Sequence, residues 1–209
     1  MNLAVPVSSA GQVVADQAVS YPVTDSATVF HGRIWDVVAD AVELPGGGKV
    51  RREYVRHPGA AAVIALDLAE RVLLQRQYRH PVRAELYEPP AGLLDVPGEA
   101  PALTGRRELF EEADLRADDW RHLITFNTTP GGANEVIHIL VARGLSVVPE
   151  AERFVRSEEE ANLVPVWLPL AEACQLVMAG SLHSPTAVVG LLAAWQARCA
   201  GGFDSLPEV

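Results

Sequence analysis

Short segments that mix apolar and polar residues dominate the first quarter of the chain. Residues 29–38, 40–44 and 50–57 carry valine, isoleucine or aromatic residues among polar ones, and a proline-glycine turn lies at 45–48. Such segments bounded by turn residues are typical of strands. Residues 1–20 show no strong periodicity. The pattern therefore predicts a loosely held arm followed by a small antiparallel sheet of about three strands, which needs a partner surface to be stable.

Longer apolar runs begin after residue 58. Residues 60–67 and 71–78 are almost continuously apolar, which predicts a hairpin covered on both faces. Further strand patterns lie at 122–126, 136–142 and 163–168, and helical patterns lie at 101–113, 170–179 and 184–199. This order predicts an α/β (α+β) fold in which helices sandwich a mixed sheet. The expected division is 1–57 for the arm and small sheet and 58–209 for the main domain.

Charge and composition narrow the possible partners. The 209 residues carry a formal net charge of −10, which argues against a general nucleic-acid surface or an anionic-membrane surface. The only cysteines, Cys174 and Cys199, are too few for a disulfide framework. No apolar stretch approaches the length of a membrane span, and the N-terminus lacks a signal-peptide pattern. We therefore expect a cytoplasmic protein with no nucleic-acid or membrane partner.

The predicted helix at residues 101–113 carries a concentrated group of carboxylates. Glu108, Glu111 and Glu112 stand at i, i+3 and i+4, so a helix places them on one face. Like charges so close favour a bound cation, and oxygen ligands without nearby His or Cys favour Mg²⁺ or Mn²⁺. A backbone carbonyl at Ala91 can reach the same cation. The alternative interpretation is a solvated acidic face of the helix.

The segment around these carboxylates resembles the Nudix box, G-x5-E-x7-R-E-U-x-E-E-x-G-U with U an aliphatic residue. Its fixed positions are matched by Gly92, Glu99, Arg107, Glu108, Leu109, Glu111, Glu112 and Leu115. The segment departs from the pattern in two ways. Six residues instead of five separate Gly92 from Glu99, and Asp114 replaces the second glycine. Because Asp tolerates the left-handed conformation better than most residues, we expect Asp114 to keep the same turn.

Other segments extend the resemblance to bacterial ADP-ribose pyrophosphatases of the actinobacterial type, over roughly residues 25–200. The segments that carry it are Arg52-Glu53, the apolar pair of strands, residues 76–82, residues 88–95 and Thr129-Pro130-Gly131. The resemblance implies a Nudix α/β/α sandwich preceded by the small N-terminal sheet. It also implies divalent-metal-dependent hydrolysis of ADP-ribose to AMP and ribose 5-phosphate.

The resemblance implies a role for each matched residue of the helix. Glu108 and Glu112 are expected to be the principal metal ligands, with the Ala91 carbonyl completing the shell. Glu111 is expected to bridge the ions or bind another, so that two or more Mg²⁺ or Mn²⁺ ions occupy the site. Arg107, paired with Glu99, is expected to orient the carboxylates.

The general base and the substrate contacts are expected from other segments. The matching acidic segment makes Glu160 the first candidate for the base and Glu159 the second, with Glu135 as a further alternative. Expected substrate-binding residues are Arg52, Arg79, Glu88, Pro130, Gly131 and Glu135. Trp35 or Phe30 is a candidate for contact with the adenine.

The resemblance further implies a homodimer in which the N-terminal sheets are exchanged, so that Arg52 acts across the interface. The small-molecule partner is then a nucleoside diphosphate sugar. Two alternatives stay open at this point. One is a Nudix hydrolase of another nucleoside diphosphate sugar, such as GDP-mannose, or of a dinucleotide. The other is a nucleotide-binding module without catalytic activity.

Overall fold

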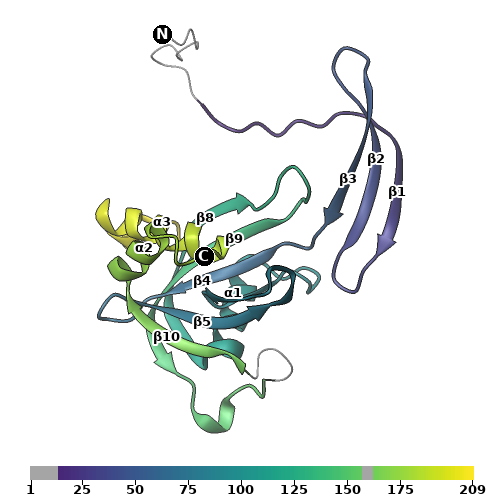
Figure 1. Ribbon diagram of the computed structural model, residues 1–209. Helices are drawn as coiled ribbons and strands as arrows, with labels where there is room; N and C mark the ends of the chain where they lie inside the picture. The colour runs from purple at the N-terminus through teal and green to yellow at the C-terminus, as the bar shows by residue number, and fades with distance from the viewer. Residues whose placement is uncertain (1–13, 157–161) are drawn as a thin grey trace.

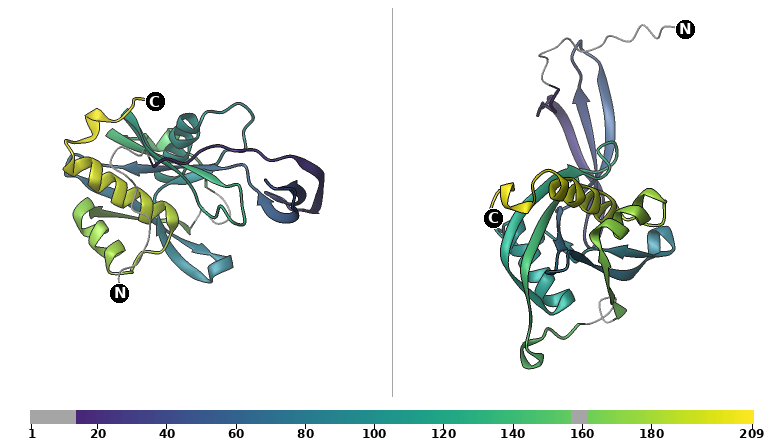
Figure 2. Two further views of the ribbon diagram at one scale, coloured as in Figure 1. Left: turned by 90° about the horizontal axis from the view of Figure 1, so that it is seen from above. Right: turned by 90° about the vertical axis from the view of Figure 1, so that its left-hand side faces the viewer.

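The computed structural model describes residues 14–156 and 162–209. Its first three strands, β1 (Val23–His31), β2 (Asp36–Glu43) and β3 (Lys49–Arg56), form an antiparallel sheet in the order β1-β2-β3. This N-terminal sheet projects away from the rest of the chain (Figures 1 and 2). The predicted three-stranded sheet is therefore confirmed. The predicted arm falls partly on residues 1–13, which lie outside the described residues.

The prediction of one strand over residues 29–38 is wrong, because a turn at Gly32 divides this stretch between β1 and β2. The Gly32 N–H donates to the carbonyl of Trp35 at 3.0 Å. A Cβ at Gly32 would lie 2.3 Å from that same carbonyl oxygen, so only glycine fits the turn. Apolar residues continue on both sides of the turn, so Gly32 was the one sign of the break in the sequence.

The N-terminal sheet is joined to the main body through the end of β3. The Val55 N–H donates to the Gly132 carbonyl at 2.9 Å, and the Asn134 N–H donates back to the Val55 carbonyl at 3.1 Å. The His57 N–H adds a hydrogen bond to Asn134 Oδ1 at 2.7 Å. These bonds fix the sheet to the loop at residues 128–135.

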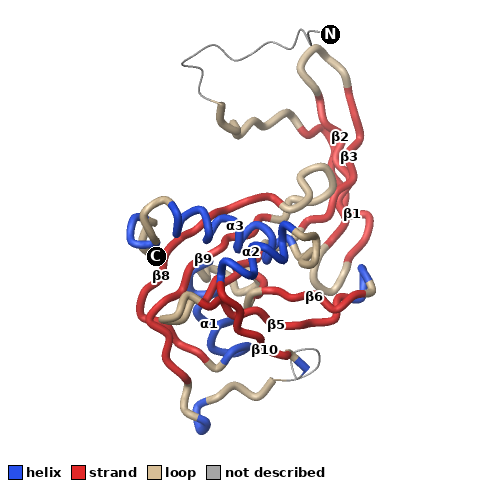
Figure 3. Tube along the Cα trace, turned by 60° about the vertical axis from the view of Figure 1, so that its left-hand side comes forward, coloured by secondary structure: helices blue, strands red, loops and turns tan. Residues whose placement is uncertain are grey.

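Two further sheets form the main body (Figure 3). The first has the order β7-β4-β9-β8, built from β7 (Ala91–Leu93), β4 (Ala60–Ala65), β9 (Val136–Val147) and β8 (Leu115–Asn127). Its β4–β9 pair is parallel and its other pairs are antiparallel. The second is antiparallel in the order β10-β5-β6, built from β10 (Val164–Pro169), β5 (Arg71–Arg79) and β6 (Ala84–Glu88). The mixed sheet predicted from the sequence is therefore present.

The predicted hairpin of residues 60–67 and 71–78 is wrong, because β4 and β5 belong to different sheets. A single bridge between Leu66 and Val72 joins them near the turn. Both strands are buried, as their apolar runs indicated. Burial on both faces is compatible with either arrangement. Each strand lies between a nearby partner, β7 for β4 and β6 for β5, and a distant one, β9 for β4 and β10 for β5.

Three helices cover the two faces of the central sheet. On one face, α2 (Leu170–Met178) and α3 (Pro185–Cys199) share a core with Ile64 and Ile139. On the other face, α1 (Pro101–Ala113) places Leu109 in a core with Val63 and Leu140. The arrangement confirms the predicted α/β/α sandwich, and all three predicted helices are present within one or two residues of their expected ends.

A glycine in α1 allows the helix to approach the sheet closely. A Cβ on Gly105 would lie 2.5 Å from Leu140 Cδ1. The approach brings the carboxylate-bearing face of α1 against β7. None of the helices in the described residues is both long and apolar enough to cross a membrane.

The packing of α1 gives a testable prediction. Leu109 is fully buried, so Leu109→Ala should lower the free energy of unfolding by about 2–5 kcal/mol in urea denaturation. Leu103 on the same helix is half exposed, and Leu103→Ala should change this free energy by less than about 1 kcal/mol. Equal effects of the two substitutions would contradict the assignment of Leu109 to the core.

Candidate active site

The ends of α1 are set by a proline at its start and by Asp114 at its end. Pro101 occupies the first turn, where its missing N–H costs no hydrogen bond. The helix stops at Asp114, which has φ 54° and ψ 37° and therefore lies in the left-handed region. The expectation that Asp114 keeps the turn of the usual glycine is confirmed. The three glutamates consequently lie in the last two turns of the helix.

Two of these glutamates contact β7 directly. A Cβ at Gly92 would lie 1.9 Å from Glu108 Oε1, so the Glu108 carboxylate occupies the space that glycine leaves open. The Ala91 N–H donates to Glu112 Oε2 at 3.1 Å. Glu108 is only 6% exposed. The box glycine and the two expected principal ligands are thus brought together at one short strand.

Arg107 binds the remaining carboxylates of the box. Its Nη1 lies 2.5 Å from Glu108 Oε1 and 3.4 Å from Glu111 Oε2, and its Nη2 donates to Glu99 Oε2 at 3.2 Å. The Thr104 hydroxyl also donates to Glu99 Oε2, at 2.8 Å. The arginine therefore holds three carboxylates in fixed positions.

The hydrogen bonds around Arg107 also affect protonation. The bonds from Arg107 and then from Thr104 lower the pKa of Glu99. Burial disfavours the charge on Arg107, but its hydrogen bond to Glu99 and the charges of Glu108, Glu99 and Glu111 outweigh burial and raise the pKa of the guanidinium. Both groups are therefore charged at neutral pH.

Two side chains from other elements bind the carbonyls at the end of α1. Gln75 of β5 donates from Nε2 to the Glu112 carbonyl at 2.7 Å. Arg156, in the connection between β9 and β10, donates from Nε to the Glu111 carbonyl at 2.7 Å. Carbonyls in the last turn of a helix lack partners within the helix, so these two bonds satisfy them.

The carboxylates offer the donor type that a hard divalent cation requires. Glu108, Glu111 and Glu112 provide oxygen donors, and the Ala91 carbonyl belongs to the same strand that Glu112 contacts. Within residues 14–156 and 162–209, no three His, Cys, Asp or Glu side chains already surround a common ion position. Arg107 instead holds Glu108 and Glu111 in this structure. The residues fit a divalent cation in their chemistry.

A cavity of about 570 Å³ reaches the same strand. Ala91 and Gly92 of β7 line it, whereas the three glutamates of α1 do not. The other lining residues come from the β1–β2 turn (Ile34, Trp35), the ends of β5 and β6 (Tyr78, Arg79, His80, Pro81, Glu88), the loop before β9 (Thr128, Thr129, Glu135) and the start of α3 (Ser184, Pro185, Thr186), with His57, Ala60, Leu93 and Ile137. The cavity is therefore built from segments far apart in the sequence.

The charged residues of this cavity are held by their neighbours. Arg79 donates from Nε and Nη2 to Glu88 Oε2, at 2.9 and 2.6 Å. Glu135 Oε2 accepts a hydrogen bond from the Thr128 hydroxyl at 2.5 Å. The Trp35 ring lies 5.6 Å from the ring of His57, between ring centres. An aromatic ring, an arginine and two carboxylates thus share the cavity.

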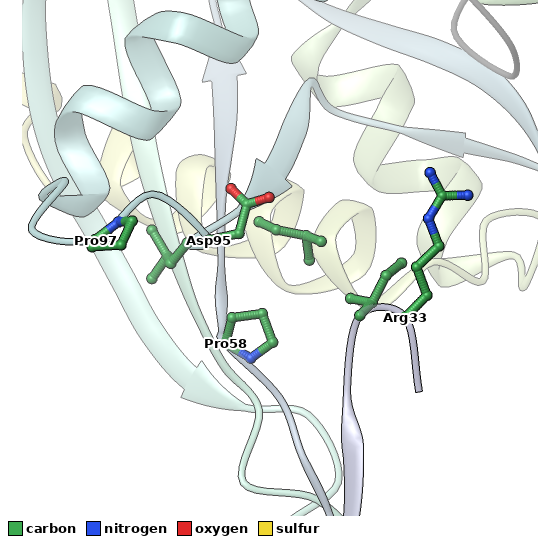
Figure 4. A pocket seen from close by; sticks show the side chains of 7 residues that line it. Arg33, Pro58, Asp95 and Pro97 are labelled. Atoms are coloured by element: carbon green, nitrogen blue, oxygen red, sulfur yellow. The ribbon is translucent and has the colours of Figure 1, made fainter. Parts of the chain in front are cut away.

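A second cavity of about 390 Å³ lies beside the first and shares Ile34 and Leu93 with it. Figure 4 shows Arg33 of the β1–β2 turn on one side of this cavity and Asp95 and Pro97 of the loop before α1 on the other, with Pro58 between them. The loop with the extra residue of the Nudix box therefore faces the N-terminal sheet.

Some of the expected substrate residues lie elsewhere in this single chain. Arg52 is exposed on β3, where its Nη1 donates to the neighbouring Arg51 carbonyl at 3.0 Å. Pro130 and Gly131 are exposed and do not line the cavity. Glu159 and Glu160 lie outside the described residues. Their predicted roles are therefore not tested by this arrangement.

Sequence reasoning missed two residues that support the helix from other elements, Gln75 and Arg156, and one residue of the helix itself, Thr104. All three stand outside the fixed positions of the Nudix box. The buried, polar character of Gln75 within an apolar strand was the one available signal, because a buried amide needs hydrogen-bond partners. Ser184 and Thr186 also line the cavity, but in the sequence they indicated only the start of a helix.

Comparisons with known proteins agree with the geometry. The model of the NUDIX domain matches residues 55–186. The chain is 42% identical over 170 residues to an ADP-ribose pyrophosphatase of Mycobacterium tuberculosis, covering 80% of each chain. It is 38% identical over 163 residues to a methanol dehydrogenase activator of Bacillus methanolicus, covering 78% of this chain and 86% of the relative.

A solved structure described as an ADP compounds hydrolase has the same fold. It superposes with a TM-score of 0.71 at 24% identity, covering 90% of this chain and 99% of that chain. The family model matches most of the chain, and the mycobacterial relative is 42% identical to it. Both findings indicate the same family as the box residues around Gly92. This chain belongs to the Nudix family.

Proposed function

We propose that this protein hydrolyses the diphosphate of ADP-ribose to AMP and ribose 5-phosphate. The observation that carries the proposal is the placement of the Glu108 and Glu112 carboxylates on Gly92 and Ala91, two residues that also line the large cavity. The similarity to an ADP-ribose pyrophosphatase over 80% of each chain supports this choice of substrate. Residues 1–57 would serve as the arm and small sheet, and residues 58–209 as the hydrolase domain.

Nudix hydrolases generally use divalent metal ions, and we infer that this one uses two or more Mg²⁺ or Mn²⁺ ions. Glu108, Glu112 and the Ala91 carbonyl would hold the principal ion, and Glu111 would bridge to another. Bound divalent ions supply positive charge that neutralises the diphosphate and makes phosphorus open to attack by water. Arg107 keeps the carboxylates oriented through its bonds to Glu108, Glu111 and Glu99.

Side chains of the protein would accept the proton of the attacking water and bind the substrate. The new bond forms between the water oxygen and one phosphorus, and the bridging phosphorus–oxygen bond breaks. The proton of the water passes to a carboxylate, for which Glu160, Glu159 and Glu135 are the candidates in that order. Arg79 and Glu88 would bind polar groups of the substrate from inside the cavity, and Trp35 would stack on the adenine.

We further propose a homodimer in which the N-terminal sheets are exchanged. Several large apolar side chains of this sheet are at least two-fifths exposed in the single chain: Val23, Val29, Phe30, Ile34 and Trp35. Exposed apolar residues gathered in one module favour a partner surface. In such a dimer Arg52, Pro130 and Gly131 would contribute to the substrate site.

The carboxylate assignment gives the first test of this function. Glu112→Gln removes the negative charge and keeps the size of the side chain, so kcat for ADP-ribose should fall by roughly 100-fold or more. Release of AMP measures the rate, with GDP-mannose and a dinucleotide tested in parallel. Glu172→Gln on the exposed face of α2 is the matched control and should retain wild-type kcat. Unchanged hydrolysis in Glu112→Gln would refute the role of this carboxylate, and preference for another compound of the panel would refute ADP-ribose as substrate.

The contact of Glu108 with Gly92 gives a second test. The methyl group of Gly92→Ala would occupy the position of the Glu108 carboxylate, so kcat should fall by roughly 100-fold. Gly48→Ala is the control, because a Cβ on Gly48 meets no atom within 4 Å and Gly48 does not have a positive φ. Retained activity in Gly92→Ala would show that the carboxylate does not need this position.

The oligomeric state gives a third test. Size-exclusion chromatography with light scattering should report twice the chain mass of 22.5 kDa. Phe30→Asp should weaken the dimer by about tenfold or more, because it places a charge in an apolar interface. Leu68→Asp alters a fully exposed leucine outside the N-terminal sheet and should leave the dimer intact. A monomer at micromolar concentration would exclude the exchanged dimer.

A further inference from the structure

Arg156 contacts the end of α1 at two points. Its Nε donates to the Glu111 carbonyl at 2.7 Å, and its Nη2 lies 2.6 Å from Asp114 Oδ2. The second contact is an ion pair without the alignment of a hydrogen bond. Both side chains are largely buried, with 26% of Arg156 and 19% of Asp114 exposed. The connection between β9 and β10 is therefore joined to the helix by a charged pair that is partly shielded from water.

Asp114 stands where the Nudix box has glycine, and its backbone keeps the conformation for which glycine is the favoured residue. A residue with a Cβ pays a conformational cost at φ 54°. The Asp114 side chain offers what glycine lacks, a carboxylate within ion-pair distance of Arg156. Its carbonyl also accepts a hydrogen bond from the Val148 N–H at 2.8 Å, so the same connection holds the backbone of this residue. The aspartate that replaces the box glycine therefore forms an ion pair that glycine could not form.

The anchored turn is the one that carries the proposed ligands. Glu111 and Glu112 lie three and two residues before Asp114, and their carbonyls accept from Arg156 and Gln75 respectively. A cationic side chain at the C-terminal end of a helix is also favoured by the helix dipole. Any rotation or fraying of this turn would move both carboxylates away from β7.

We propose that Arg156 and Asp114 are a positioning pair, which fixes the last turn of α1 and thereby places the carboxylates of Glu111 and Glu112 for metal binding and hydrolysis. The activity part of this inference rests on the proposed function. The pair contacts the last turn of α1 through the Glu111 carbonyl and, through the Asp114 carbonyl, the start of the β9–β10 connection at Val148, so it acts through the two glutamates.

A double-mutant cycle tests the pair. Asp114→Gly restores the glycine of the box and keeps the turn, while Arg156→Met keeps the side-chain stem without its charge. Each should lower kcat for ADP-ribose about tenfold, with KM within about twofold, and weaken Mn²⁺ binding about tenfold in an EPR titration. The double variant should lose no more than either single variant, because the two groups act as one unit. Arg153→Met is the control, since Arg153 donates to the Val148 carbonyl within the same connection, and it should behave as wild type.

The double-mutant cycle distinguishes a pair that positions the glutamates from an aspartate that only ends the helix. Wild-type kcat and Mn²⁺ affinity in Asp114→Gly would overturn the proposal, because the aspartate would then serve only the turn. Additive losses in the double variant would also overturn it. If Arg156→Met fails to fold by circular dichroism, Asp114→Gly decides the question alone. If the wild-type protein does not hydrolyse ADP-ribose, the proposed function fails, while the Mn²⁺ titration still tests the pair.

Discussion

The contact between Glu108 and the backbone of Gly92 is the constraint on which the rest of the site depends. The carboxylate fills the space of an absent side chain, so the distance between α1 and β7 is set by one glycine. A carboxylate buried this deeply is stable only when it is paired and hydrogen-bonded. Arg107 provides that pairing and extends it to Glu99 and Glu111. The close packing of Glu108 on Gly92 thus requires the positive charge of Arg107. Arg107 in turn holds Glu99 and Glu111 beside Glu108.

The same helix is held by the core on its opposite side. Leu109 is fully buried in the core with Val63 and Leu140, and Gly105 lets the helix approach Leu140. The carboxylates are therefore mounted on a rigid element, which is the arrangement that holds a catalytic site within a few tenths of an ångström. Gln75 and Arg156 add hydrogen bonds at the end where fraying would otherwise begin.

Local patterns predicted local structure, and pairing over long distances could not be predicted in the same way. The helix at 101–113 follows from spacing and end signals that lie within the segment itself. The apolar runs of β4 and β5 indicated burial, but each strand has one partner, β9 for β4 and β10 for β5, that lies more than 70 residues away. For the same reason the box residues could be predicted, whereas Gln75 and Arg156 could not. These two contact the end of α1 from 37 and 45 residues away in the sequence, so only the folded chain brings them there.

The cavity connects the N-terminal sheet to the hydrolase domain. Ile34 and Trp35 at the tip of the sheet form one wall, and Glu135 and Thr128 of the loop before β9 form another. That loop is also where β3 attaches, through the bonds of Val55 and His57 to residues 132–134. Because one loop both anchors the sheet and lines the cavity, a displacement of the sheet changes two walls at once. The wall formed by Ile34 and Trp35 and the wall formed by Thr128 and Glu135 therefore keep their relative positions only while the attachment of β3 to this loop is intact.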